Sequence, residues 1–303
     1  MRRLPWQVPR RGQAIATALA ALFLLLSFAG AASAAEADTV ARGAYLASAA
    51  GCENCHTDKA QGGQRYAGGP ALPTRFGTFY GPNITADPDT GIGRWTDAQF
   101  LEALRDGVRA DGANLFPAFP YPSFTGITDA DALAIKAYLF SLPPVRYESR
   151  PQDVWFPFSW RSLVSIWKLL FLTEGPFQPL ADRSAEYNRG AYLVTVLGHC
   201  GECHTPRNWF GAMEADAFLA GTSAGPDGKK VPNITPDQAT GIGKWSEQDI
   251  VNLLKDGQTP DFDFVGGAMS AVVNDTAQLT DADRKAIAVF LKSVPAKPFG
   301  GKG

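Results

Sequence analysis

The chain has 303 residues and carries 28 Lys and Arg against 30 Asp and Glu. This near balance excludes the strongly basic character of nucleic-acid-binding domains, so we expect no nucleic-acid partner. The length is sufficient for two small domains.

The first 34 residues have the pattern of a signal peptide. A basic stretch from Arg2 to Arg11 precedes an apolar run from Ala14 to Ala32, and Ala32-Ser33-Ala34 offers a small-residue cleavage site. We therefore expect residues 1–34 to direct export to the periplasm and to be removed. Because the apolar run is long for a signal peptide, an uncleaved anchor in the inner membrane is the alternative.

One short string occurs twice, as Cys52-Glu53-Asn54-Cys55-His56 and as Cys200-Gly201-Glu202-Cys203-His204. CxxCH is a c-type haem attachment signature, in which two thiols add to the porphyrin vinyl groups and the adjoining imidazole binds the iron. A zinc site would need four ligands, and a thioredoxin-like dithiol would need a βαβ setting, neither of which the sequence offers. We predict two covalently bound haem c groups, held by Cys52, Cys55, Cys200 and Cys203, with His56 and His204 as iron ligands.

Other strings recur in the same order around each CxxCH. They are RGAYL at 42–46 and 189–193, PNIT at 82–85 and 232–235, TGIG at 90–93 and 240–243, and TDAD at 128–131 and 280–283. This pattern predicts a tandem duplication of one helical domain rather than a solenoid. We expect an all-α fold with domains at 38–147 and 186–297, joined by a connector at 148–185.

Each copy is expected to contain three main helices. The first carries RGAYL toward CxxCH, and in the first copy a Gly- and Pro-rich loop follows over 61–81. Thr96 with Gln99 forms a capping-box pattern for the second helix, and Ser246 with Asp249 forms a weaker one. The last helix starts at TDAD and ends before the next proline.

The connector is the most aromatic part of the chain. Arg161 and Lys168 interrupt it, so a membrane span is not expected. One interpretation is a strap that packs across both domains, and the other is a docking surface for a partner subunit or a membrane interface. Its large aromatic residues are Trp155, Phe156, Phe158, Trp160, Trp167 and Phe171.

An iron-binding histidine needs an acceptor for its second ring nitrogen, and the carbonyls of Pro82 and Pro232 are candidates. The alternative is that PNIT only forms a turn. For the sixth ligand of haem 2 we predict Met269, in the string GGAMSAVV, because methionine sulfur is a common haem ligand that raises the potential. A core methionine is the alternative interpretation.

Haem 1 has no methionine in its own domain, and the corresponding loop contains Phe119. Three outcomes remain open. The iron is five-coordinate under Phe119, or a weak ligand occupies the site, or His199 reaches over from the second domain. The weak-ligand candidates are Tyr121, Asn114 and Lys59. Each outcome would separate the potentials of the two haems.

Four further polar or aromatic residues recur at matched positions in the two copies: Arg42, Arg189, Trp95 and Trp245. One hypothesis is that they donate hydrogen bonds to haem propionates. The alternative is packing and surface charge, which we favour for the two arginines.

Long stretches such as FGTFYGPNITADPDTGIGRWTDAQFLEALRDGVRADGANLFPAFPY, FPFSWRSLVSIWKLLF and NRGAYLVTVLGHCGECHTPRNWFGA resemble the cytochrome c subunits of membrane-associated bacterial dehydrogenases for alcohols, gluconate and related sugars. The resemblance implies class I cytochrome c domains. It also implies electrons taken from a quinoprotein, flavoprotein or molybdenum-type dehydrogenase. Family members commonly carry three such domains, whereas we expect two here. Many also read PAMPY where this chain reads PAFPY, with Phe119 in the ligand's place.

The sequence therefore favours a periplasmic dihaem electron carrier that is not itself an enzyme, with quinone, another cytochrome or an oxidase as acceptor. We also expect it to associate with the inner-membrane surface. The alternative is a dihaem peroxidase with an open haem 1. That reaction needs a distal acid–base group, and the first domain has no second histidine. A ligand-sensing haem protein is a third interpretation.

Overall fold

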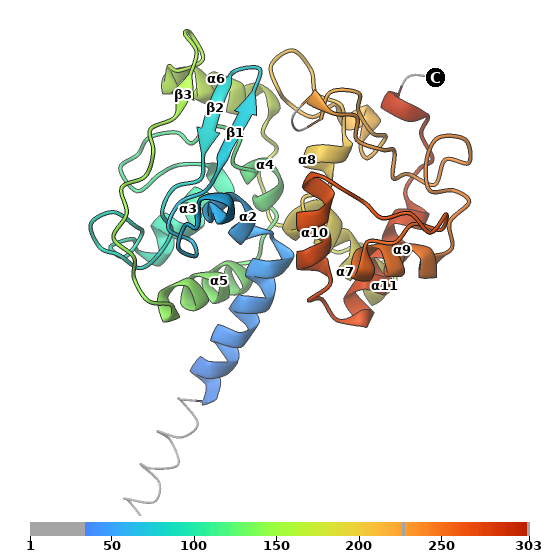
Figure 1. Cartoon of the computed structure of the whole chain (residues 1–303), viewed down its shortest axis with the longest axis horizontal. Helices are drawn as coiled ribbons and strands as arrows, with labels where there is room; N and C mark the ends of the chain where they lie inside the picture. The colour runs from blue at the N-terminus through green and yellow to red at the C-terminus, as the bar shows by residue number, and fades with distance from the viewer. Residues whose placement is uncertain (1–33, 226–227, 302–303) are drawn as a thin grey trace, which may run out of the picture.

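The computed structural model describes residues 34–225 and 228–301 (Figure 1). The expected signal peptide lies outside these residues except for its last position, Ala34. An N-terminal half, 34–147, and a C-terminal half, 186–301, lie side by side, and the segment 148–185 links them along the chain (Figure 1). Within the described part of the chain, no helix combines the length and apolar character needed to cross a membrane.

Helices form the framework of both halves, as predicted. The N-terminal half contains a first helix at 34–49, α2 (Cys52–His56), a 3-10 turn (Lys59–Gln61), α3 (Asp97–Asp106), α4 (Tyr121–Phe124) and α5 (Asp129–Ser141). The segment 148–185 contains α6 (Arg161–Phe171). The C-terminal half contains α7 (Ala185–Tyr192), a π-helical turn (Leu193–Leu197), α8 (Gly201–His204), a 3-10 turn (Ala215–Ala217), α9 (Glu247–Asp256), α10 (Ala268–Thr276) and α11 (Asp281–Ser293).

The predicted helix starts are confirmed. Thr96 caps α3 and Ser246 caps α9, each with a complete capping box. In this arrangement the cap side chain accepts from the backbone N–H three residues on, and the side chain at that position accepts from the cap N–H. The threonine of each TDAD string, Thr128 or Thr280, caps α5 or α11 with its side chain, although the reciprocal bond is not formed.

A small sheet departs from the all-α prediction. β1 (Ala71–Thr74) and β2 (Gly77–Tyr80) form an antiparallel hairpin inside the expected loop, and β3 (Asp153–Val154) pairs with β2. A β-carbon at Gly77 would lie 2.2 Å from the Asp153 carbonyl oxygen, so only glycine permits this pairing. β1 and β2 have only four residues each, which is too short for a clear alternation of apolar and polar residues. Their partner β3 comes from a distant part of the chain, so the sequence did not predict this sheet.

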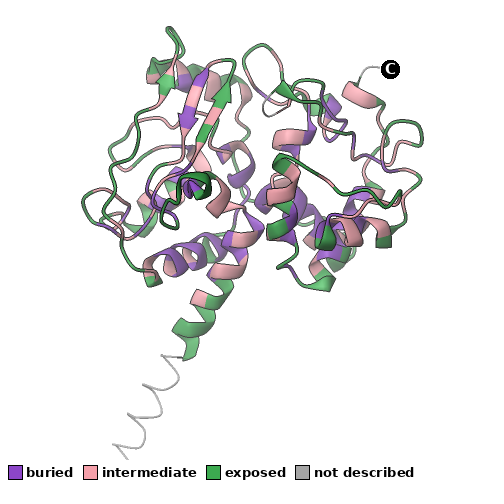
Figure 2. Ribbon diagram, viewed as in Figure 1, coloured by how far each residue is buried: buried purple, intermediate pink, exposed green. Residues whose placement is uncertain are grey.

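Glycines in the two RGAYL strings bring the helices of each half together. A β-carbon at Gly43 would lie 1.9 Å from the carbonyl oxygen of Ala134 in α5. The same substitution at Gly190 would place it 1.9 Å from the carbonyl oxygen of Ala286 in α11. The first helix therefore crosses α5, and α7 crosses α11, at backbone contact. Figure 2 shows buried residues gathered on α5, α7 and α11, and one hydrophobic cluster includes residues of both halves.

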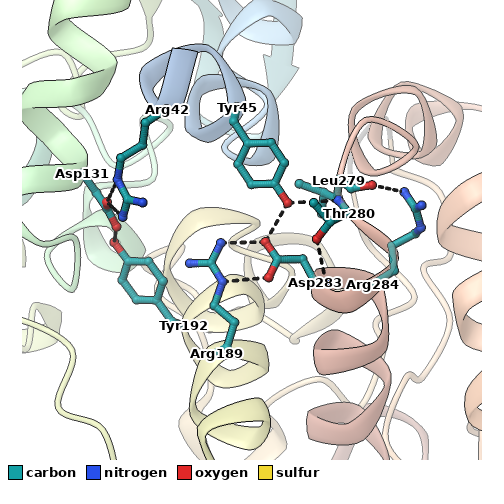
Figure 3. A network of polar contacts seen from close by, with 9 residues as sticks. All are labelled: Arg42, Tyr45, Asp131, Arg189, Tyr192, Leu279, Thr280, Asp283 and Arg284. Carbon is teal, nitrogen blue, oxygen red and sulfur yellow. Dashed lines mark hydrogen bonds and ion pairs between the residues drawn. The ribbon is translucent and has the colours of Figure 1, made fainter. Parts of the chain in front are cut away.

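A polar network joins the halves beside this core (Figure 3). Tyr192 of the C-terminal half donates a hydrogen bond to Asp131 at 2.8 Å, and Asp131 is also paired with Arg42. Reciprocally, Tyr45 of the N-terminal half donates to Asp283 at 2.7 Å, and Arg189 pairs with the same carboxylate at 2.6 Å. Each aspartate thus receives an arginine from its own half and a tyrosine from the other.

The packing interpretation that we favour for Arg42 and Arg189 is supported by this network. Arg42 is paired with Asp131 and Arg189 with Asp283, so both arginines serve the packing of their own half. The corresponding role of Trp95 and Trp245 stays a prediction.

We expect acid to weaken this network. Burial disfavours ionisation of Asp283, but hydrogen bonds from Arg189 and Tyr45 outweigh it, so its pKa lies below the ordinary 3.8. A depressed carboxylate pKa adds stability above the unfolded-state value that is lost as pH falls through the folded-state value. Asp283→Asn should cost about 1–3 kcal/mol at neutral pH and flatten the acid limb of the stability profile. Denaturant unfolding across pH measures both, with the exposed Asp261→Asn as control. An unchanged acid limb in Asp283→Asn would contradict the assignment.

Candidate haem sites

Each CxxCH string lies directly after the first helix of its half. Cys52 and Cys55 lie on α2, while Cys200 precedes α8 and Cys203 lies within it. Residues three apart on a helical turn share one face, so each string presents two sulfurs together, with its histidine next to the second. All four cysteines are free thiols.

The environment of the thiols favours an uncharged sulfur. Cys55 is exposed as a residue and the other three cysteines are partly buried, yet desolvation by the surrounding protein raises the pKa of Cys52 and Cys200 to about 12. Desolvation also raises the pKa of Cys55 and Cys203. A thiol that attacks a disulfide needs a lowered pKa, so these cysteines do not fit a dithiol redox pair. A thioether carries no charge, so this donor set fits covalent haem, and among the described residues no cluster of three His, Cys, Asp or Glu could hold a metal ion.

The two histidines are held as iron ligands require. The Nδ1 of His56 lies 2.7 Å from the Pro82 carbonyl oxygen, and the Nδ1 of His204 lies 2.8 Å from that of Pro232. A carbonyl can only accept, so Nδ1 carries the proton and Nε2 keeps its lone pair. Burial lowers the pKa of both rings, which keeps them neutral. The predicted proline acceptors are confirmed.

The asparagine of each PNIT string anchors the loop that carries the proline carbonyl. Asn83 donates to the Val145 carbonyl at 2.8 Å, and Asn233 donates to the Lys297 carbonyl at 2.7 Å. Each asparagine also accepts from the threonine two residues on. The strings therefore recur because both halves tie the proline loop to the chain that follows the last helix.

Met269 and Phe119 occupy matching places. The N–H of Leu115 donates to the Gly107 carbonyl, and the N–H of Val265 donates to the Gly257 carbonyl, so the two loops leave their preceding helices in the same way. Phe119 and Met269 each follow four residues later. These contacts support the equivalence of the two positions, and the ligand role of Met269 stays a prediction.

The weak-ligand candidates for haem 1 have different surroundings. Lys59 is ion-paired with Glu53 at 3.0 Å, and Asn114 accepts a hydrogen bond from Lys168 at 2.7 Å. Tyr121 is fully buried, and its hydroxyl makes no hydrogen bond among the described residues. Of the three, only Tyr121 has an uncommitted polar atom.

Each string makes a hydrogen bond to the opposite half. Asn54, in the first string, donates to Asp275 of α10 at 2.5 Å. Glu202, in the second string, accepts from Ser123 of α4 at 2.8 Å. Burial raises the pKa of Asp275 to about 6. These contacts were not predicted from the sequence, because nothing local marks a contact between positions 79 and 221 residues apart.

Comparison with known proteins agrees with this geometry. The cytochrome c family model matches residues 40–143. The diheme cytochrome c-type of Cereibacter sphaeroides is 44% identical over 84% of this chain and 86% of its own length. One of the subunits of nicotinate dehydrogenase from Pseudomonas putida is 45% identical over 85% of the chain, and the fructose dehydrogenase cytochrome subunit of Gluconobacter japonicus is 43% identical over 87%. The chain spans 21% and 54% of those two proteins.

The resemblance identified from the sequence is confirmed. Cytochrome c subunits of quinone-dependent alcohol dehydrogenases and of gluconate 2-dehydrogenase are also similar to this chain, at 40–42% identity.

Proposed function

The chain belongs to the cytochrome c family, whose haem is covalently bound, and on this premise we propose that it is a dihaem electron carrier. It consists of two class I cytochrome c domains, 38–147 and 186–297, that arose by tandem duplication. The connector 148–185 joins them. The contacts that repeat in both halves support this division.

Two haem c groups are held by the two strings. In each, both cysteines form thioethers and the histidine binds iron, and Met269 is the sixth ligand of haem 2. The iron supplies one-electron exchange, while the chain attaches the groups, keeps the imidazoles neutral and sets the ligand on each side. The residues concerned are Cys52, Cys55, His56, Cys200, Cys203, His204 and Met269. The observation that carries the proposal is the buried histidine with Nδ1 on a proline carbonyl in both halves.

The carrier takes electrons from a dehydrogenase and passes them to quinone, another cytochrome or an oxidase. It performs no substrate chemistry of its own. All three histidines of the sequence have an assigned place, because His56 and His204 face proline carbonyls and His199 contacts the Ala50 carbonyl. None is assigned as the distal acid–base group that a peroxidase uses. The location is the periplasm, at the inner-membrane surface, after export by residues 1–34.

Purification from membranes tests the function. We expect two haem equivalents per chain by pyridine haemochrome assay, and rapid reduction of both when the copurifying dehydrogenase receives its substrate. Fewer than two haems, or turnover of peroxide at a rate comparable with reduction by the dehydrogenase, would refute the carrier assignment.

The dehydrogenase docks on an apolar surface of the connector. This surface comprises Trp155, Phe156, Trp160, Ile166, Leu169 and Leu170, all exposed, with Leu169 84% exposed. The two charged residues between positions 155 and 171 are bonded to the N-terminal half. Arg161 donates to the Asn114 carbonyl, and Lys168 donates to the Asn114 side chain and the Gly107 carbonyl. The outward face is therefore uncharged. A partner protein that buries it fits the relatives, several of which are cytochrome subunits of dehydrogenases.

We expect Leu169→Glu combined with Leu170→Glu to abolish copurification of the dehydrogenase while both haems remain attached. Each buried carboxylate would have to be desolvated without a partner, which costs several kcal/mol (~3 or more). Phe262→Glu, at an exposed aromatic of the C-terminal half, is the matched control and should copurify normally. Normal copurification of the double variant would exclude this surface as the docking site.

A further inference from the structure

The approach to the second CxxCH string contains one additional residue. Leu46 and Leu193 end the two RGAYL strings, but Cys52 follows after six positions and Cys200 after seven. The C-terminal half absorbs the difference in the π-helical turn Leu193–Leu197, whereas the first helix of the N-terminal half stays α-helical to position 49. Single π-turns inside helices are rare and are found frequently at functional sites.

The residue that follows this turn has an unusual backbone. His199 directly precedes Cys200 and has φ 35°, in the left-handed region. At the matching position before Cys52 the N-terminal half has Gly51, with φ 59°. Glycine adopts this conformation without a penalty, whereas a residue with a β-carbon is strained in it. A strained histidine where glycine suffices calls for a functional explanation.

The His199 ring crosses to the other half. Its Nε2 lies 3.3 Å from the Ala50 carbonyl oxygen, and it packs edge-to-face with the Phe124 ring, with the ring centroids 5.4 Å apart and the planes at 85°. Because a carbonyl only accepts, Nε2 carries the proton. Desolvation lowers the pKa of the ring, which keeps it neutral. Ala50 is two residues before Cys52, and His199 is one residue before Cys200. One hydrogen bond, from the His199 side chain to the Ala50 backbone, therefore joins the two segments that lead into the haem attachment strings.

We propose that His199 is a positioning residue that couples the two haems. Its hydrogen bond to Ala50 fixes the separation of the two attachment segments and supplies a bonded path, Cys200–His199···Ala50–Gly51–Cys52, for electron exchange between them. One electron leaves one haem and enters the other, so one iron is oxidised as the other is reduced and no bond is made or broken. This role rests on the proposed dihaem function.

Holding the two halves together does not by itself explain the position and backbone conformation of His199. The halves are already joined by Tyr45 to Asp283, Tyr192 to Asp131 and Asn54 to Asp275. None of these contacts requires a π-turn or a left-handed side-chain-bearing residue. His199 adds a contact at a position where both partners lie within two residues of a haem-binding cysteine.

The test uses the holoprotein with three variants. His199→Phe keeps a ring edge against Phe124 but cannot donate to Ala50, and His199→Gln retains an amide donor. Tyr45→Phe removes a different hydrogen bond between the halves and is the control. After rapid photoreduction, the relaxation of absorbance between the two haems gives the exchange rate. Haem content, the two potentials and thermal stability are measured alongside.

We expect exchange to slow several-fold in His199→Phe, to recover in part in His199→Gln and to stay unchanged in Tyr45→Phe. Nitrogen NMR of the wild-type ring should show Nε2 protonated. An unchanged rate in His199→Phe, or a proton on Nδ1 instead, overturns the role of His199 while the carrier function stands. A wild-type haem content below two overturns the carrier function and this role with it.

Discussion

Replacing Cys52 and Cys55 together by alanine is expected to halve the covalent haem content, from two equivalents to one. The same result is expected for Cys200→Ala with Cys203→Ala, and the quadruple variant should carry none. The reason is that each string is complete in itself, with two thiols three residues apart and its own histidine held by its own proline carbonyl. Pyridine haemochrome assay against protein concentration, after acid–acetone extraction of free haem, measures the count.

Met213→Leu is the control for this series, because it changes a sulfur residue of the second half outside both strings. Its haem content should remain at two. A double-cysteine variant that keeps both haems, or that loses both, would contradict two independent attachment sites. Loss of both with an otherwise folded chain would instead indicate that attachment at one string depends on the other.

What could be predicted from the sequence was local. CxxCH, the capping boxes and the TDAD helix starts each depend on residues within a few positions of one another, and the structure places them as expected. The Pro82 and Pro232 acceptors were also within reach, because proline marks a break in local hydrogen bonding and a ligand histidine needs an acceptor. Local chemistry of this kind does not depend on how the halves meet.

The remainder depends on contacts between distant segments. Arg42 and Arg189 recur in the sequence, and each pairs with an aspartate 89 or 94 residues away, which no local pattern indicates. The β1–β2 hairpin is completed by a strand from the connector. The sequence pointed to His199 only as a ligand, and its contact with Ala50 lies 149 residues away. A repeat in one sequence shows that a position matters without showing what it touches.

The repeated RGAYL string illustrates how one string serves two purposes. Its glycine permits backbone contact with the last helix of its own half, and its tyrosine reaches the aspartate of the other half. The core of each half and the interface are therefore built from different faces of the same helix. A change at Tyr45 or Tyr192 would remove one hydrogen bond between the halves while leaving each haem string intact.

The wild-type protein is expected to titrate in two separated redox steps, since Met269 is the proposed ligand of one haem and Phe119 takes the matching place at the other. Met269→Leu removes the sulfur at nearly constant volume and should lower the upper potential by on the order of 100 mV, because axial ligation sets haem potentials over a wide range. Spectroelectrochemical titration measures both steps. Met213→Leu, at the other methionine of the described chain, should leave both potentials in place.

The reciprocal change should narrow the separation. Phe119→Met places a thioether where the C-terminal half has Met269, on a loop whose departure from the preceding helix is fixed by the same hydrogen bond in both halves. The lower potential should rise toward the upper one, and the two steps should partly merge. If Met269→Leu moves neither potential, the sulfur is not a ligand. If Phe119→Met alone has no effect, the loop of the N-terminal half does not approach its haem as the other loop does, and the equivalence of the two positions fails.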